Sequence, residues 1–176
     1  MSERNLYSGN VSAFLHALES EEATRFVEFG TSEVTCLSEL ISAVTWAKAV
    51  ELHCAPTFDR NDSEVRFDSA LMSAADRSTV QFNLVKHIGT DTEVNDAILE
   101  LSESAKFDGA YIAGSSSAEG LLTVMMVCNE ALRSRGVLAV ANHIELEDSL
   151  APALASFRDM YGDDYEEISP QVFHKY

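Results

Sequence analysis

Hydrophobic residues recur along this chain in two patterns that take turns. In some segments they return every three or four positions, as Val11, Phe14 and Leu18 do, which is typical of an amphipathic helix. In others they form short runs or alternate with polar residues, as Val80 and Phe82 do, which indicates strands. The predicted helices are 11–18, 34–47, 63–75, 92–105, 118–133 and 146–161; the predicted strands are 25–29, 49–54, 80–85, 108–113 and 137–141, with more strand in the tail from Tyr165.

This alternation predicts an α/β fold with a mostly parallel central sheet and helices on both faces. Strands separated by helices of ten to fifteen residues form βαβ units with right-handed crossovers. The apolar run 137–141 suits a strand that is covered on both faces. The chain has 176 residues and shows no repeats or linkers, so we expect one domain, 1–176, with a helical segment at 1–22 and an α/β core at 23–176.

The net charge and the cysteines limit the binding partners and the cellular location that the sequence allows. There are 29 acidic and 12 basic residues, a net charge of −17, which disfavours nucleic acid and anionic membrane surfaces as partners. We see no apolar run near the roughly 20 residues that span a bilayer, and no signal core near the N-terminus. A cytoplasmic location is therefore expected. Cys36, Cys54 and Cys128 are widely spaced in apolar surroundings, and we predict that they are buried free thiols.

Candidate site residues follow the predicted strands, because ligands of open parallel sheets bind beyond the carboxyl ends of the strands. In chain order they are Glu28, Gly30, Thr31 and Ser32; His53 and Cys54; His87, Gly89, Thr90 and Asp91; Ala113, Gly114 and the serines 115–117; and Asn142 and His143. Gly30 allows a backbone to approach a ligand closely. The Glu28 carboxylate can attract a cation or cap a backbone amide. The serines can hold an anion at a helix N-terminus, but we favour an N-cap.

Several of these stretches match one known family in order and spacing. They are 26–32 (FVEFGTS), 107–114 (FDGAYIAG), 119–121 (EGL) and 132–138 (LRSRGVL). Over 26–144 the chain resembles the class I S-adenosylmethionine-dependent methyltransferases, above all the small-molecule O-methyltransferase branch. The resemblance implies a three-layer Rossmann-like methyltransferase fold and S-adenosylmethionine as cofactor.

The resemblance also implies roles for the candidate residues. Glu28 and Gly30 would border the methionine moiety, with Thr31 and Ser32 as hydrogen-bonding neighbours. His53 stands where the family places the carboxylate that binds both ribose hydroxyls. A neutral imidazole has one donor and one acceptor and cannot replace a bidentate carboxylate. Asp91 or another group would then have to bind the ribose, and the alternative for His53 is an ordinary partly buried histidine. Further cofactor-binding candidates are Gly89, Thr90, Ala113 and Gly114.

No divalent metal is expected in this site. The metal-dependent branch carries carboxylates where this chain has Ala113 and Ala141, and hard cations require oxygen ligands. His143 is the candidate catalytic base, because a neutral imidazole can accept a substrate proton, and His87 is a second candidate. A zinc site formed by these two with His53 is a weaker alternative, since no thiolate or carboxylate spacing supports it.

The sequence thus favours metal-independent methyl transfer from S-adenosylmethionine to a small-molecule acceptor that is uncharged or cationic. The main alternative is an inactive methyltransferase-like fold that serves as a binding or regulatory module, because the second glycine of the first motif and the ribose carboxylate are missing. A Rossmann-like protein for another nucleotide is a third reading. The nearly continuous apolar sequence of helix 118–133 suggests a homodimer.

Overall fold

The chain forms one seven-stranded sheet flanked by helices. The computed structural model describes residues 4–31, 35–56, 61–141 and 148–176, with backbone alone at 4–9, 31, 35–36 and 61–63. The helices are α1 (Arg4–Ser20), α2 (Thr35–Ala43), α3 (Asn61–Ala75), α4 (Asp91–Ser104), α5 (Ala118–Ala131) and α6 (Ala151–Tyr161). The strands are β1 (Arg25–Thr31), β2 (Ala49–Pro56), β3 (Gln81–Lys86), β4 (Phe107–Ile112), β5 (Leu132–Val140), β6 (Tyr165–Ser169) and β7 (Val172–Lys175).

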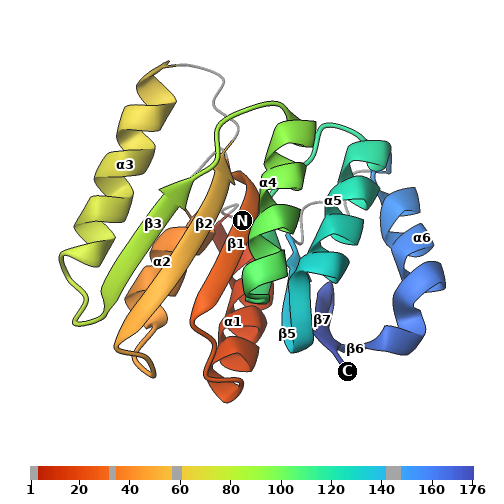
Figure 1. Cartoon of the computed structure of the whole chain (residues 1–176), viewed down its shortest axis with the longest axis horizontal. Helices are drawn as coiled ribbons and strands as arrows, with labels where there is room; N and C mark the ends of the chain where they lie inside the picture. The colour runs from red at the N-terminus through yellow and green to blue at the C-terminus, as the bar shows by residue number, and fades with distance from the viewer. Residues whose placement is uncertain (1–3, 32–34, 57–60, 142–147) are drawn as a thin grey trace.

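The sheet order is β3-β2-β1-β4-β5-β7-β6. Strands β1 to β5 are parallel, whereas β7 runs antiparallel to both β5 and β6. Helices α1 and α2 lie behind the sheet and α4 and α5 lie in front of it (Figure 1). The predicted three-layer α/β fold with a mostly parallel sheet is therefore confirmed. Because the chain moves outward from β1 to β3 and then returns to β4, the strand order reverses between β1 and β4.

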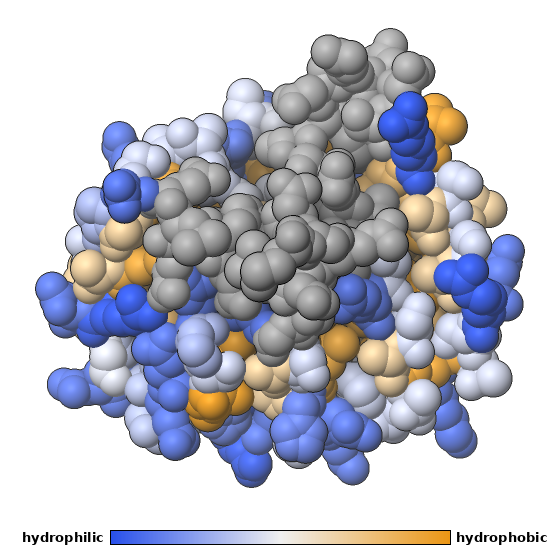
Figure 2. All heavy atoms as spheres, turned by 180° about the vertical axis from the view of Figure 1, so that it is seen from behind, coloured by the Kyte–Doolittle hydropathy of each residue, from blue (hydrophilic) through white to orange (hydrophobic). Residues whose placement is uncertain are grey.

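The core lies on both faces of the central strands. In β5 the last five residues are all buried, as expected for a strand covered by helices on each side. Phe14 of α1 packs on Tyr111 of β4 with ring centroids 5.5 Å apart. In the C-terminal part of the chain, the ring of Phe157 in α6 packs against that of Phe173 in β7. From behind, hydrophilic residues cover most of the described surface and hydrophobic ones form small separate groups (Figure 2).

Strand β5 begins five residues before the predicted start at Val137, and α5 ends at Ala131, two residues before the predicted end. Leu132 pairs with Phe107 of β4, and the Arg133 guanidinium binds the carboxylate of Asp108. The register then shifts between Phe107 and Gly109, opposite Arg135, whose φ of 66° is left-handed. Strand pairing with β4 therefore outweighs the helical pattern at the end of α5.

The tail forms a hairpin of two strands, where the sequence predicted strand without a turn. The turn places Gln171 at φ 59° with its side chain fully buried. Neither polar atom of that amide has a hydrogen-bond partner. Gln171 therefore combines a left-handed backbone with an unpartnered buried amide, two features that each cost stability.

Most apolar residues of α5 are at least partly buried against other elements of the same chain. Its residues Leu121, Met125 and Cys128 are fully buried, and α5 lies between α4 and α6 on the sheet. Met126, in contrast, is a large hydrophobic residue of this helix that is 43% exposed. The homodimer inferred from this helix stays a prediction. None of the described helices is long and apolar enough to cross a membrane.

The cysteine prediction is confirmed where the structure describes the side chains. Cys54 and Cys128 are buried free thiols. Burial, with a smaller contribution from the charge of Glu28, raises the pKa of Cys54 to about 12. The side chain of Cys36 lies outside the described residues.

Candidate functional site

The end of β1 touches the segment that follows β4. Gly30 has a left-handed φ of 72°, and a Cβ added to it would lie 2.2 Å from the carbonyl oxygen of Gly114. The amide of Ala113 donates to the carbonyl of Phe29 at 2.8 Å. Only glycine fits such a turn without strain. The two segments form this close contact at the strand-order reversal, which is where open α/β sheets bind ligands.

Glu28 lies two residues before this turn and is 2% exposed. In the sheet it is aligned with Cys54 on one neighbouring strand and with Tyr111 on the other. Burial first, and the nearby Glu28 carboxylate second, raise the pKa of the Cys54 thiol. A buried carboxylate at this place favours a cationic group nearby.

His53 of β2 lies inside a chain of polar side chains. The ring is 2% exposed, and its Nδ1 lies 2.8 Å from Nε2 of His87, with the two rings stacked at 5.1 Å. Its Nε2 contacts the carboxylate of Glu51, which also accepts a hydrogen bond from Arg25 Nε at 2.9 Å. The ring of Phe107 meets His53 edge-on. Both nitrogens of His53 therefore have protein partners.

The contacts among Glu51, His53 and His87 indicate which of these side chains carry protons. The hydrogen bond with His53, aided by Arg25, lowers the pKa of Glu51, so Glu51 is a carboxylate that only accepts hydrogen bonds. His53 then donates from Nε2 to this carboxylate, and one proton lies between its Nδ1 and Nε2 of His87, which are 2.8 Å apart. Burial, and secondly the proximity of His53, lowers the pKa of His87 and keeps that ring neutral near pH 7.

The segment between β3 and α4 places Gly89, Thr90 and Asp91 at the start of a helix. Thr90 is the N-cap of α4, and the Glu93 carboxylate accepts a hydrogen bond from the Thr90 amide at 2.8 Å. This bond, with one from the Thr90 hydroxyl, lowers the pKa of Glu93. Asp91 is exposed in the first turn. The positive end of α4 is thus satisfied by its own residues.

The segment between β4 and α5 likewise caps the helix that follows it. Ser117 is the N-cap of α5, and its hydroxyl accepts a hydrogen bond from the Gly120 amide at 3.0 Å. The Ser115 hydroxyl donates to the carbonyl of Ser117. Of the three serines, Ser117 is the helix cap, as predicted, and Ala113 and Gly114 remain as the residues that border the Gly30 turn.

The topology and the glycine contact can be compared with solved structures. An O-methyltransferase from Streptomyces achromogenes, TomG, involved in tomaymycin synthesis and solved in complex with S-adenosylmethionine, superposes with a TM-score of 0.68 at 14% identity, covering 99% of this chain and 78% of that one. The fold is that of the class I methyltransferases.

Two further structures support the methyltransferase fold. A methyltransferase from Podospora anserina bound to S-adenosylhomocysteine gives a TM-score of 0.59 at 13% identity, with 99% of this chain and 78% of that chain covered. An O-methyltransferase from Bacillus cereus, also with S-adenosylhomocysteine, gives 0.59 at 10% identity, with 99% and 79% covered. No protein-family profile matches the sequence, and no curated protein is similar to it at a significant level.

Some predicted positions in this methyltransferase fold fall outside the described residues. These are Ser32, Asn142 and His143, and Thr31 is described by its backbone alone, as the last residue of β1. Among the described side chains, no three His, Cys, Asp or Glu residues come together as a metal-binding group. The roles assigned to the site residues from the sequence stay predictions.

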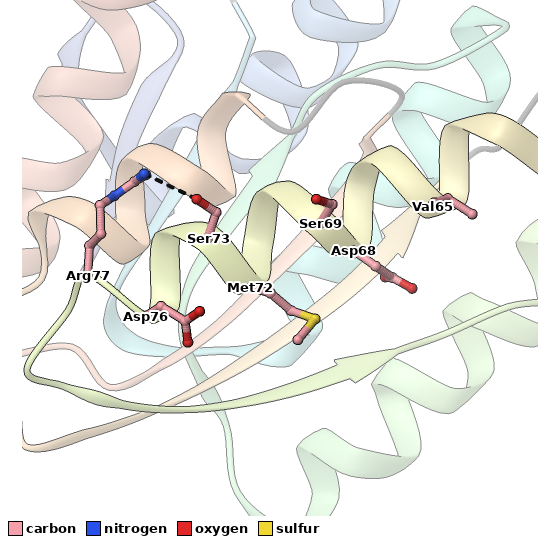
Figure 3. A pocket seen from close by; sticks show the side chains of 7 residues that line it. All are labelled: Val65, Asp68, Ser69, Met72, Ser73, Asp76 and Arg77. Carbon is pink, nitrogen blue, oxygen red and sulfur yellow. Dashed lines mark hydrogen bonds between the residues drawn. The ribbon is translucent and has the colours of Figure 1, made fainter.

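An open groove lies elsewhere, along the outer side of α3 (Figure 3). Its lining residues all belong to α3 or directly follow it: Val65, Asp68, Ser69, Met72, Ser73, Asp76 and Arg77. None of the predicted site residues contributes to it. The groove is therefore separate from the edge where β1 and β4 meet.

Sequence reasoning missed the partnership of Glu51 with His53. Residues two apart on a strand point to the same face, so the pattern Glu51-Leu52-His53 carries the signal for this contact. The contribution of His87 from β3 had no local signal, because it depends on the pairing of His53 with Val85.

Proposed function

We propose that this protein transfers a methyl group from S-adenosylmethionine to a small-molecule acceptor without a metal ion. The observation that carries the proposal is the contact of Gly30 with Gly114 at the strand-order reversal, with Glu28 buried beside it. The similar structures that hold S-adenosylmethionine or S-adenosylhomocysteine support it. When bound, S-adenosylmethionine supplies an electrophilic methyl group on a positively charged sulfur.

The described residues fit part of this cofactor. The turn at Gly30 lets backbone amides approach the methionine moiety, and Glu28 offers negative charge to its ammonium or sulfonium group. Gly89, Thr90 and Asp91, with Ala113 and Gly114, border the same edge. His53 is held by Glu51 and His87, so we assign the ribose contact to Asp91 or to residues outside the described part.

Catalysis would come mainly from holding the methyl group and the acceptor together away from water. Bound S-adenosylmethionine would supply the methyl group to a hydroxyl or amine acceptor and keep the electron pair of the broken carbon–sulfur bond, and a base of the protein would accept the proton that the acceptor loses. We propose His143 as this base. Ala113, and Ala141 at 1% exposure, supply no oxygen ligand for a metal.

We further propose that the protein acts in the cytoplasm on small molecules, as a homodimer, without nucleic acid or membrane partners. The support is its net charge of −17, which repels phosphate-rich surfaces. The rival function is a binding module that has lost its cofactor, and the engaged ring of His53 is the observation that favours it.

Isothermal titration calorimetry with S-adenosylmethionine and S-adenosylhomocysteine separates the two. The transferase proposal expects heat of binding in this titration. In a separate unfolding experiment, ligand at 100 times its dissociation constant should raise the free energy of unfolding by about 2.7 kcal/mol. Glu28→Ala should abolish the binding, whereas Glu130→Gln, a change at the other end of the molecule, should leave it intact. Absence of any heat or thermal shift at millimolar ligand supports the binding module instead.

A further inference from the structure

Two buried amide side chains meet at the turn between β6 and β7. Gln171 in this turn is fully buried, and neither Nε2 nor Oε1 of its amide has a hydrogen-bond partner among the described residues. Asn10 of α1 lies against the same turn, because its Nδ2 donates to the carbonyl of Pro170 at 2.9 Å. Asn10 is 2% exposed, and its Oδ1 likewise has no partner in the described part of the chain. These two side chains, the amide pair, therefore offer one donor group and two acceptor oxygens.

The backbone of this turn is held on several sides, so the missing contacts are confined to the side chains. The amide of Gln171 donates to the Glu167 carboxylate at 2.9 Å, and its carbonyl accepts from the Val140 amide at 3.0 Å. The φ of 59° at Gln171 is a left-handed value that glycine would adopt without strain. Strained residues of this kind concentrate at binding sites, and a buried polar group without a protein partner indicates a role beyond the fold.

The amide pair lies at the same edge of the sheet as the Gly30 turn. Backbone hydrogen bonds at the carboxyl ends of the strands run from Ala113 to Phe29, from Ala141 to Ile112 and from Val140 to Gln171. This row joins β1, β4, β5 and the turn before β7, so β4 and β5 lie between Gly30 and Gln171. At about 4.8 Å between neighbouring strands the separation is about 14 Å. An acceptor can therefore reach the amide pair while its reacting atom lies nearer to the cofactor.

We propose that the amide pair binds an uncharged polar group of the acceptor that carries a hydrogen-bond donor next to an acceptor atom, as a carboxamide does. The inference rests on the proposed function. A primary carboxamide can donate one N–H to Oε1 of Gln171 and accept from its Nε2, and its second N–H can go to Oδ1 of Asn10.

The same chemistry disfavours charged groups. A carboxylate has no hydrogen to donate to the two amide oxygens, and an ammonium group cannot accept from Nε2. Both members of the amide pair are neutral, so neither offers the opposite charge that a buried ion requires. The carboxylate of Glu167 is already engaged by Arg158 at 2.9 Å.

The test is an NMR titration of the full-length protein with benzamide and salicylamide, and with benzoate, salicylate and benzylamine as charged counterparts. Each titration is run with and without S-adenosylhomocysteine. The two carboxamides should give saturable shifts of protein resonances, and the charged compounds should bind at least about tenfold more weakly, as expected for the loss of two hydrogen bonds.

Two matched variants locate the binding. Gln171→Met keeps a side chain of similar length without the amide, and it should weaken binding of the carboxamides about tenfold or more. Gln81→Met makes the same substitution at an exposed position of β3 and should leave the binding unchanged. Circular dichroism of both variants checks that the fold is retained.

The other outcomes are distinguishable. If neither carboxamide binds at millimolar concentration, the amide pair is not a ligand site and the inference is overturned. If a charged compound binds as tightly as its uncharged counterpart, or Gln171→Met binds as tightly as the native chain, the inference is also overturned. If the carboxamides bind as expected but S-adenosylhomocysteine does not, the proposed transferase function fails while the amide pair stands as a site for uncharged ligands.

Discussion

Substituting Gly30 by alanine tests the turn on which the proposed site depends. The added Cβ would lie 2.2 Å from the Gly114 carbonyl oxygen and 2.9 Å from its carbon, and both are backbone atoms that cannot rotate away. The left-handed φ of 72° adds about 1–2 kcal/mol for any residue with a Cβ. Separating the two segments would also weaken the bond from Ala113 to Phe29, worth about 1 kcal/mol.

The expected loss for Gly30→Ala is therefore about 2–3 kcal/mol of unfolding free energy, or a drop of about 4–12 °C in the unfolding midpoint for a chain of this length. Binding of S-adenosylmethionine should be lost, because the alanine methyl group forces the Gly30 turn and the Gly114 segment apart. Urea unfolding and calorimetry measure the two effects.

Gly162→Ala is the matched control. Gly162 has a helical φ of −57°, and a Cβ there would meet nothing within 4 Å. Its replacement should be neutral or stabilising by about 0.4–1 kcal/mol. If Gly30→Ala is as stable as Gly162→Ala and binds the cofactor with native affinity, the close contact between the ends of β1 and β4 is not part of a binding site.

Three further changes probe other features. Gln171→Met should raise the urea midpoint, because it removes an unpartnered buried amide that costs about 1–3 kcal/mol, and a lower midpoint would contradict this. The pKa of His87 is lower in the folded chain than in the unfolded one, so the unfolded chain binds more protons and stability should fall as the pH drops below about 6.5. The unfolding midpoint of the unsubstituted chain should therefore fall more than that of His87→Gln as the pH drops from neutral to below about 6.5. Equal falls in the two midpoints would refute the lowered pKa of His87. In a Cys36→Ser background, Cys54 should react with a thiol reagent only after unfolding, since its pKa is raised to about 12, and rapid labelling of the native chain would show that the thiol is accessible.

The fold could be predicted from the sequence because the central strands are buried on both faces. Their short apolar runs contrast with the helical spacing between them, as at 137–141 against the preceding helix. The start of β5 at Leu132 could not be predicted, because it depends on pairing with Phe107, 25 residues earlier in the chain. Long-range pairing of this kind leaves no periodic signal near the residue concerned.

A glycine at position 30 could be predicted to allow a close backbone approach, because only this residue type adopts a left-handed turn without strain. The structure shows such an approach to Gly114, and the approach of a ligand to Gly30 stays a prediction. His53 was aligned with a ribose-binding carboxylate, but its actual partners come from Glu51 on its own strand and His87 beyond β3. Side-chain partners across a sheet depend on the strand order, which family motifs indicate only indirectly.

The most direct test of the central claim is a calorimetric titration of the native full-length chain with S-adenosylmethionine, repeated with Glu28→Ala. The account predicts saturable binding of one cofactor per chain by the native protein and none by the variant. A native chain that gives no heat at millimolar cofactor, or a variant that binds as tightly as the native chain, would contradict it.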